Sequence, residues 1–156
     1  MAEDGGRQVV ARNRRAWHDY EILDTFEAGI ALLGPEVKSL RVGKATLTDA
    51  YATLRRGEIF LISAHISPYA QAARENSDPR RERKLLLHRA EISRLTAKLR
   101  ERGFTLIPLS IYFKNGRAKV ELGLARGKRQ YDKRHALRKR EQDREVQRIV
   151  RGRGRS

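Results

Sequence analysis

The amino-acid sequence predicts a mainly β fold: a small, OB-like antiparallel β-barrel with two or three short helices, followed by a basic C-terminal tail. Two observations predict the barrel. Apolar residues between positions 20 and 125 recur mostly with a period of two, which is the spacing of strands. Two long strand-like runs also flank an Asn-Gly pair, the strongest short signal of a β-hairpin. The tail is predicted by positive charge that collects after residue 125, where large apolar side chains are few.

The first half of the barrel is expected from two stretches of alternating sequence. Residues 20–33 indicate two short strands joined around residues 27–29. Residues 45–54 indicate a further strand, and the polar residues from Arg55 to Glu58 supply a turn after it. Short strands separated by turns of this kind are typical of antiparallel sheets.

The second half of the barrel is expected from three apolar runs. Residues 58–66 are almost continuously apolar, which indicates a strand buried on both faces. Residues 104–113 and 117–125 flank Asn115 and Gly116, and both of these residue types tolerate the positive φ of a tight hairpin turn. In the last run the alternate residues predicted to face the core are Val120, Leu122 and Leu124.

Three helices are expected between and before these strands. Asn13 is a suitable N-cap for a short helix over residues 14–18. A second helix is predicted to begin at Gly34–Pro35 and to stop at Gly43. The third spans about residues 88–102. Its apolar stripe consists of Ile92, Leu95 and Leu99, and Gly103 follows it at the C′ position.

Composition limits the classes of function. The chain has 156 residues, a formal net charge of +16 and no cysteine, with a pI near 11.0. The missing cysteines exclude disulfides, thiolate metal sites and cysteine nucleophiles, while the charge points to a polyanionic partner such as nucleic acid. No apolar run approaches the 18 residues of a membrane span, and no secretory signal precedes the body. We therefore expect a soluble, cytoplasmic protein.

The charge divides the chain into two parts. Residues 1–125 hold 22 basic and 15 acidic side chains, whereas residues 126–156 hold 13 basic and 4 acidic ones. We assign residues 1–126 to the barrel, with a frayed stretch over residues 1–6, and residues 127–156 to the tail. A segment so poor in apolar side chains is expected to be disordered in isolation and to order only when phosphates neutralise it.

Nothing in the sequence indicates catalysis. The four histidines are scattered without the spacing of metal ligands, and no phosphate loop, zinc-protease motif or nucleophile motif is present. Glu27, Glu36 and Asp49 are isolated carboxylates, which in strand proteins usually lie at the surface or in turns. We expect no enzyme, no cofactor and no metal.

The basic residues form several groups along the chain. One surrounds the first helix, a second lies on and after the second helix, and a third occupies residues 77–84, SDPRRERK, which is interpreted as an exposed loop. Singly, these side chains are consistent with solvated faces. Together they favour nucleic acid, because counterion release gives any such surface affinity for phosphates. A barrel with a basic arm fits RNA better than duplex DNA, because no recognition helix or zinc finger is present.

Several longer motifs, in this order, resemble those of the bacterial family of small protein B, the SsrA-binding proteins. They are NRRAWHDY at residues 13–20, EAGIALLGPEVKSLRVGKATLTDAY at 27–51, HISPY at 65–69, DPRRERKLLL at 78–87 and GLARGKRQYDKR at 123–134. The resemblance covers about residues 8–145. It implies an OB-like barrel that binds transfer-messenger RNA (tmRNA, or SsrA RNA) and carries it, with elongation factor Tu and GTP, to ribosomes stalled without a usable mRNA 3′ end.

The resemblance also implies a division of labour. The barrel would hold the tRNA-like part of tmRNA and stand in for its missing anticodon arm. The tail would enter the empty mRNA channel of the small subunit, contact its rRNA and become helical on the ribosome, after which tmRNA encodes a degradation tag. The protein is expected to act as a monomer, without a membrane. Composition alone fits a ribosomal protein or a ribosome-assembly factor that binds rRNA equally well.

Two sets of residues follow from the resemblance and from the positive charge. The expected RNA contacts are Asn13, Arg14, Arg15, Glu27, Lys38, Arg41, Lys84, Leu86, Leu87, Lys119, Lys128 and Arg129. The expected contacts with the decoding centre and mRNA channel are Tyr131, Asp132, Lys133, Arg134, Arg138, Lys139, Arg140, Arg144, Arg148 and Ile149. Glu27 is expected to accept N–H groups of bases, and the alternative is that it caps a turn at residues 27–29.

Overall fold

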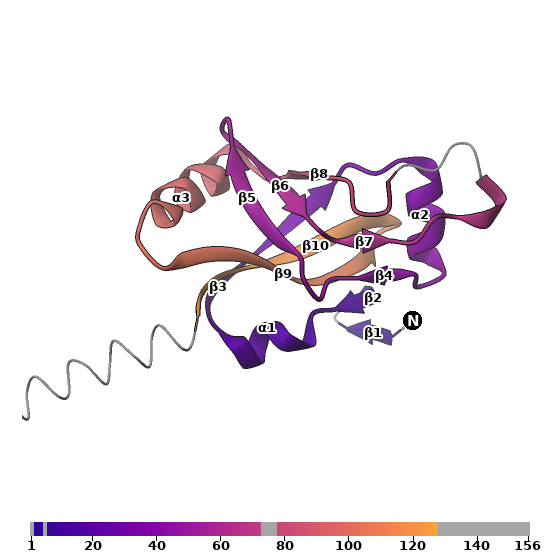
Figure 1. Cartoon of the computed structure of the whole chain (residues 1–156), viewed down its shortest axis with the longest axis horizontal. Coiled ribbons are helices and arrows are strands. Elements are labelled where there is room, and N and C mark those ends of the chain that lie inside the picture. The colour runs from indigo at the N-terminus through magenta and orange to yellow at the C-terminus, as the bar shows by residue number, and fades with distance from the viewer. Residues whose placement is uncertain (1, 5, 73–77, 128–156) are drawn as a thin grey trace, which may run out of the picture.

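The computed structural model describes residues 2–4, 6–72 and 78–127 (Figure 1). The elements, in chain order, are β1 (Ala2–Asp4), β2 (Arg7–Arg12), α1 (Arg14–Asp19), β3 (Tyr20–Ile30), α2 (Gly34–Arg41), β4 (Ala45–Thr46), β5 (Tyr51–Arg55), β6 (Glu58–Ile62), β7 (His65–Ile66), a 3-10 turn (Ala70–Ala72), β8 (Arg83–Leu86), α3 (Arg89–Leu99), β9 (Phe104–Lys114) and β10 (Arg117–Gly127). None of the helices in these ranges is long and apolar enough to cross a membrane.

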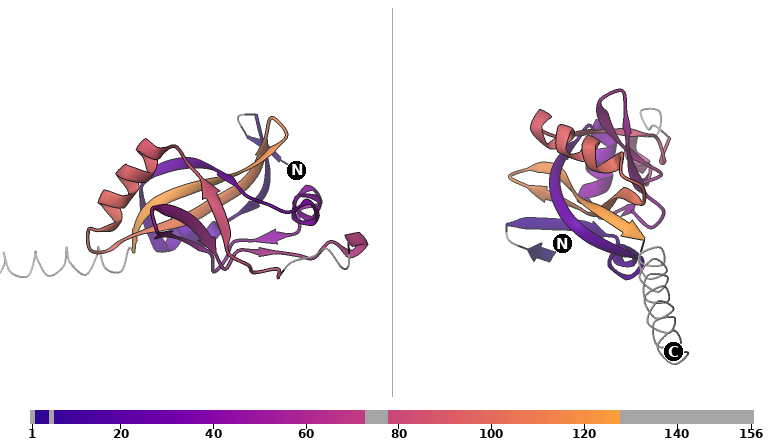
Figure 2. Two further views of the ribbon diagram at one scale, coloured as in Figure 1. Left: turned by 90° about the horizontal axis from the view of Figure 1, so that it is seen from above. Right: turned by 90° about the vertical axis from the view of Figure 1, so that its left-hand side faces the viewer.

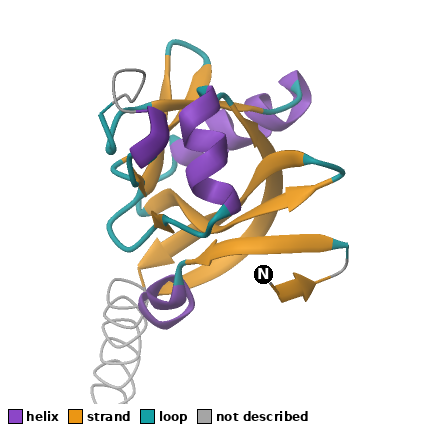
Figure 3. Ribbon diagram, turned by 90° about the vertical axis from the view of Figure 1, so that its right-hand side faces the viewer, coloured by secondary structure: helices purple, strands orange, loops and turns teal. Residues whose placement is uncertain are grey.

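Eight of the described strands form a curved antiparallel sheet that closes on itself, and β4 pairs with β7 in a separate sheet of two strands. The order of the larger sheet is β1-β2-β9-β10-β3-β8-β6-β5, and β5 pairs again with β9 through Ala52 and Leu106. Figure 2 shows the long strands β3, β9 and β10 sweeping from one end of the molecule to the other. Figure 3, with the α2 side facing the viewer, shows the ring that the strands make. The predicted OB-like antiparallel barrel with two or three short helices is therefore confirmed, and α1, α2 and α3 are these helices.

The predicted hairpin lies at the centre of this sheet. Lys114 of β9 is paired with Arg117 of β10, so the turn consists of Asn115 and Gly116 alone. Both turn residues have positive φ, 51° and 76°, as a two-residue turn matched to the twist of the strands requires. The alternate β10 residues Val120, Leu122 and Leu124 are buried in the core, as predicted.

The helices begin where the sequence predicts, although one cap differs. Pro35 lies in the first turn of α2, and Gly43 follows the helix with φ of 76°. In α3, Leu95 is buried in the barrel core, and the helix ends at Leu99 rather than near residue 102. Asn13 precedes α1 but makes no side-chain cap. Its Nδ2 instead donates to the carbonyl oxygen of Pro108 in β9, at 3.1 Å.

Three predicted strands are wrong in their extent. Residues 45–54 do not form one strand, because β4 covers only Ala45–Thr46 and pairs with β7, while β5 begins at Tyr51. Residues 20–33 do not form two short strands, because β3 runs unbroken from Tyr20 to Ile30 and pairs with β10 from Tyr20 to Gly29, with one register shift. The run 58–66 is divided at Ser63, whose φ is 62°, into β6 and β7. Burial alternates along β6, so only one face of that strand is in the core.

Three strands were not expected at all. β2 begins at Arg7 and pairs with β9. β1 pairs with β2 through residues 2–4, which contradicts a frayed N-terminus. β8 lies inside the segment interpreted as an exposed loop and joins β3 to β6. Each has a short or charge-rich sequence, so its partner strands rather than its own pattern determine its conformation.

Candidate nucleic-acid interface

Four of the expected RNA contacts line one groove. Glu27 of β3, Leu86 and Leu87 of the β8 end, and Lys119 of β10 surround a hollow of about 550 Å³. These residues lie far apart in the sequence and meet because β10 and β8 pair with opposite edges of β3. We call this hollow the β3–β8–β10 groove.

Gly29 determines the floor of this groove. It is paired with Leu86 on one side and with Lys119 on the other. A Cβ atom at Gly29 would lie only 3.3 Å from the Cβ of Leu86, so the missing side chain gives Leu86 its place beside the strand. Leu86 is 51% exposed although it is a large apolar residue, and it therefore offers the groove an apolar surface without being part of the core.

Glu27 presents an ionised carboxylate to the groove. Its Oε2 accepts a hydrogen bond from the hydroxyl of Tyr112 at 2.5 Å and lies 3.5 Å from Nζ of Lys114 and 3.6 Å from Nη2 of Arg7. The Tyr112 bond is the main cause that lowers the pKa of Glu27; partial burial opposes it, and the charges of Lys114 and Arg7 reinforce it. An ionised carboxylate is an acceptor that can bind base N–H groups. Glu27 lies within β3, so the alternative of a cap on a turn at residues 27–29 is wrong.

The cations near the groove differ in what they contact. Lys119 is half-buried and makes no ion pair with any residue in the described ranges. The guanidinium carbon of Arg41 lies 4.7 Å from the ring centroid of Phe113, which is a lining residue of the groove. Lys38, by contrast, lies 5.6 Å from the ring centroid of Tyr69. Lys119 and Arg117 are thus cations that line the groove, and Arg41 lies beside Phe113 in one of its walls.

Lys84 is engaged at the surface. Its Nζ lies 2.9 Å from Oε1 of Glu58, and the two side chains are 43% and 45% exposed. Such a pair contributes only about 0–1 kcal/mol to stability. An approaching phosphate would therefore compete with Glu58 at little cost.

The residues around α1 lie at the other end of the barrel (Figure 1). Arg14 and Arg15 are exposed, whereas Asn13 is buried. Asn13 fastens α1 to β9 through its backbone N–H as well, which donates to the carbonyl oxygen of Leu109 at 2.8 Å. Because Asn13 is buried, it can affect RNA only through the position of α1. Arg15 lines a separate hollow of about 480 Å³ at this end.

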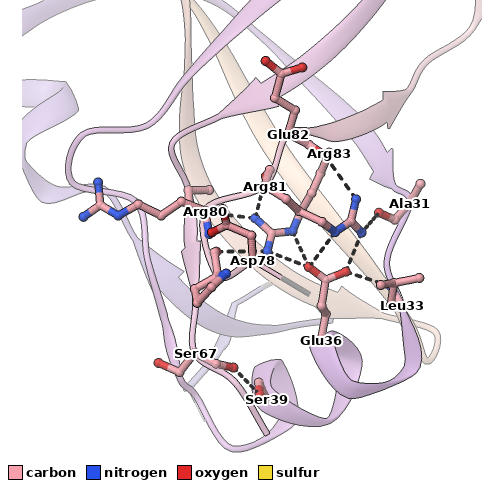
Figure 4. Close-up of polar contacts among 12 residues, drawn as sticks. Ala31, Leu33, Glu36, Ser39, Ser67, Asp78, Arg80, Arg81, Glu82 and Arg83 are labelled. Atoms are coloured by element: carbon pink, nitrogen blue, oxygen red, sulfur yellow. Dashed lines mark hydrogen bonds and ion pairs between the residues drawn. The ribbon is translucent and has the colours of Figure 1, made fainter. Parts of the chain in front are cut away.

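The interpretation of residues 77–84 as an exposed loop is wrong for Arg83, whose side chain is fully buried. Its guanidinium donates from Nε to Oε2 of Glu36 at 2.7 Å (Figure 4). Nη1 donates to the carbonyl oxygen of Ala64 at 3.0 Å. Nη2 donates to the carbonyl oxygen of Pro79 at 3.1 Å. Because Arg83 lies among other arginines in the sequence, its side chain was expected to be exposed to solvent. Its carboxylate partner, Glu36, is 47 residues away in the chain and allows it to be buried.

Glu36 was expected at the surface, but it is the carboxylate partner of buried Arg83. It is buried rather than at the surface. Besides Arg83, it accepts from Nη2 of Arg81 at 2.5 Å and from the backbone N–H of Leu33 at 2.8 Å (Figure 4). Burial is the largest single influence and opposes ionisation, but the bonds from Arg81, Leu33 and Arg83 together hold the pKa of Glu36 below its ordinary value. The signal available was a glutamate at the third position of a helix that begins Gly-Pro, a usual place for a cap.

The remaining expected contacts lie outside the described residues. They are Lys128, Arg129, Tyr131, Asp132, Lys133, Arg134, Arg138, Lys139, Arg140, Arg144, Arg148 and Ile149. The last described residue, Gly127, is paired with Tyr20 at the start of β3. The chain therefore leaves the barrel beside α1, at the end opposite to the β3–β8–β10 groove.

Comparison with known proteins gives one consistent family. The SmpB protein family matches residues 10–152. An SsrA-binding protein of Parafrankia sp. (strain EAN1pec) is 56% identical over 150 residues, covering 96% of this chain and 95% of that protein. An SsrA-binding protein of Thermobifida fusca (strain YX) is 57% identical over 148 residues, covering 95% of this chain and 92% of that protein.

A solved structure agrees with the sequence comparisons. It is described as "tmRNA-SmpB: a journey to the center of the bacterial ribosome", and one of its chains is 57% identical to this one with a TM-score of 0.64. The match covers 74% of this chain and 82% of that one. The chain belongs to the SmpB protein family.

Proposed function

We propose that this protein binds tmRNA and acts with it on the ribosome in trans-translation, as an RNA-binding adaptor rather than an enzyme. The observation that carries the proposal is the β3–β8–β10 groove, which unites an ionised carboxylate, an exposed leucine and a lysine that forms no ion pair with the described residues. The family supports it, because its members are named SsrA-binding proteins and one was solved as tmRNA-SmpB in the bacterial ribosome.

Each side chain of the groove supplies a different kind of recognition. The carboxylate of Glu27 accepts N–H groups of an exposed base, a contact that depends on which base is present. Leu86 packs against the face of a base or ribose. Lys119 and the neighbouring Arg41 neutralise phosphates, which gives affinity without sequence preference. Selectivity for one RNA therefore depends on Glu27 and Leu86 more than on the cations.

The finer mechanism divides the protein into two parts. The barrel, residues 1–126, holds the tRNA-like part of tmRNA in the place of its missing anticodon arm, and elongation factor Tu with GTP joins through the RNA. The tail, residues 127–156, enters the decoding centre and the empty mRNA channel, where residues 131–134 make the first contacts. The fold supports this division, because Tyr20, which pairs with Gly127, lies seven positions before Glu27 in β3, or about 23 Å along the strand. The protein acts as a monomer.

The alternative function is that of a ribosomal protein or assembly factor that binds rRNA. The cations of this protein would bind rRNA phosphates equally well. A protein with that function, however, does not require a groove that selects one RNA. Association with ribosomes separates the two: a rescue adaptor is bound substoichiometrically and only to stalled ribosomes. A fixed, stoichiometric association would favour the alternative.

Replacement of Glu27 by alanine is expected to weaken tmRNA binding by about tenfold to a hundredfold, because hydrogen bonds to a charged group contribute about 1.5–3 kcal/mol. Binding of an unrelated RNA of equal length should change little. Filter binding at two salt concentrations measures both. Glu101→Ala is the matched control, since Glu101 is exposed after α3 and its ion pair within the described part of the chain is with Lys98 at 3.7 Å. Equal losses on both RNAs for Glu27→Ala would exclude the selective role.

Leu86 and Leu85 offer a second test, because they are neighbours in β8 with different surroundings. Leu86 is 51% exposed and Leu85 is 2% exposed. Leu86→Ala should reduce tmRNA affinity with less than about 0.5 kcal/mol change in the free energy of unfolding, as is usual at the surface. Leu85→Ala should cost about 2–5 kcal/mol of that free energy, as core truncations do. Urea denaturation and filter binding of both variants measure this, and unchanged affinity in Leu86→Ala would remove Leu86 from the interface.

A further inference from the structure

The carboxylate of Glu27 is held in place by Tyr112, whose own side chain is not exposed to solvent. Tyr112 of β9 is fully buried, at 0% exposure, yet its hydroxyl reaches Oε2 of Glu27 at 2.5 Å. The guanidinium carbon of Arg7 lies 4.3 Å from the centroid of the tyrosine ring. A buried ring has one position, so the hydroxyl at its end is a fixed donor. Burial, reinforced by the bond to Glu27, raises the pKa of Tyr112, and the hydroxyl therefore keeps its proton.

The contacts of this carboxylate are divided unequally between its two oxygens. Tyr112, Lys114 and Arg7 all approach Oε2. Oε1 accepts no hydrogen bond from the residues that the structure describes. Glu27 also lines the β3–β8–β10 groove. One oxygen is thus fastened to the protein, while the other is left for a ligand in the groove.

Arg7 is not an equivalent anchor. It is shared with Glu121, the cross-strand neighbour of Glu27 on β10, to which it donates from Nη1 at 2.7 Å. Its approach to Glu27 is longer, at 3.6 Å. Lys114 is at 3.5 Å and its side chain is 41% exposed. Among these three partners only Tyr112 is both rigid and at hydrogen-bond distance.

We propose that Tyr112 is a positioning residue for RNA recognition: its hydroxyl fixes the Glu27 carboxylate with Oε1 free to accept base N–H groups in the groove. The inference rests on the proposed function. A free glutamate side chain loses rotamer freedom when it binds a ligand, and this loss weakens binding. Tyr112 imposes that order before the RNA arrives, and so increases the selectivity of the groove without contacting RNA itself.

The test is a double-mutant cycle on the ratio of tmRNA affinity to the affinity for a control RNA of equal length. Tyr112→Phe keeps the buried ring and removes only the hydroxyl. We expect it to lower the ratio about fivefold, and to change it less than twofold in a Glu27→Ala background, because coupled residues are not additive. Lys114→Met, which removes an exposed partner of the same oxygen, should change the ratio less than Tyr112→Phe does. Urea denaturation verifies that each variant is folded under the binding conditions.

The outcomes separate the inference from the function on which it rests. A loss for Tyr112→Phe that is as large in the Glu27→Ala background as in the native one would overturn the positioning role, because the tyrosine would then act through the fold. A loss for Glu27→Ala without any for Tyr112→Phe would overturn it too and leave the proposed function standing. An effect of Lys114→Met as large as that of Tyr112→Phe would assign the role to charge instead. No loss for either Glu27→Ala or Tyr112→Phe would overturn the inference together with the groove as the site of recognition.

Discussion

Replacement of Glu36 by alanine is expected to lower the free energy of unfolding by about 3–5 kcal/mol, the usual cost of removing one partner of a buried ion pair. The reason is Arg83, which is fully buried and has Glu36 as its carboxylate partner at 2.6 Å. Without that carboxylate, a guanidinium is left in the interior with only carbonyl oxygens. Helix α2 also loses the bond that Glu36 makes to the N–H of Leu33. Urea denaturation measures the loss directly.

The matched control for Glu36 is another arginine-bound glutamate at the surface. Glu82 pairs with Arg55 at 2.6 Å, but both side chains are about half exposed. Glu82→Ala should change stability by less than about 1 kcal/mol. If Glu36→Ala lowered the free energy of unfolding no more than Glu82→Ala does, burial of the ion pair would not be what makes Glu36 important for stability.

The same carboxylate gives stability a pH dependence of known sign. The pKa of Glu36 in the folded protein lies below its ordinary value of 4.5. A depressed pKa means that ionised Glu36 stabilises the fold fully above that ordinary value and progressively less as pH falls through the lower one. Denaturation of the native protein between neutral pH and pH 3 should show this decline, and Glu36→Ala should lack its share of it.

The sequence predicted those parts of the fold that are encoded locally. The Asn115–Gly116 turn and the start of α2 at Gly34–Pro35 depend on backbone preferences of the residues themselves, and both were correct. The extent of β3 was not, because its continuity depends on β10, a strand about a hundred residues away in the chain. The local sequence pattern cannot show that two short apolar runs form one continuous strand when a single long strand pairs with both.

The candidate site also depends on contacts between residues that are distant in the sequence, and these could be predicted even less well. Composition predicted that basic side chains would contact nucleic acid. Resemblance to a family indicated Glu27, Leu86 and Lys119 as RNA contacts, and the fold brings these three residues into one groove. Neither could show that Tyr112 lies behind Glu27, because a tyrosine in an apolar run is expected to be core and nothing more. Arg83 was mistaken for a solvated residue for the converse reason, since its charge is compensated only in three dimensions.

A chain that ends at Gly127 is expected to bind tmRNA selectively and yet to support no tagging on stalled ribosomes. The truncation keeps β10 and its pairing with β3, so the groove is left intact. It removes 12 basic and 4 acidic side chains. Affinity for every RNA should therefore fall at low salt, through the loss of counterion release, while the preference for tmRNA over a control RNA persists. Filter binding measures the preference, and a reconstituted translation system with a message lacking a stop codon measures tagging.

A second variant separates the charge of the tail from its sequence. In the full-length chain, replacement of Tyr131 and Asp132 by alanine leaves all basic side chains of the tail in place. If residues 131–134 make the first contacts in the decoding centre, this variant should bind tmRNA like the native protein and tag poorly. If charge alone carries the tail into the channel, it should tag normally, and the specific role of that motif would be excluded. Tagging retained by the truncated chain would overturn the two-part mechanism itself, because the barrel would then suffice for every step after tmRNA is bound.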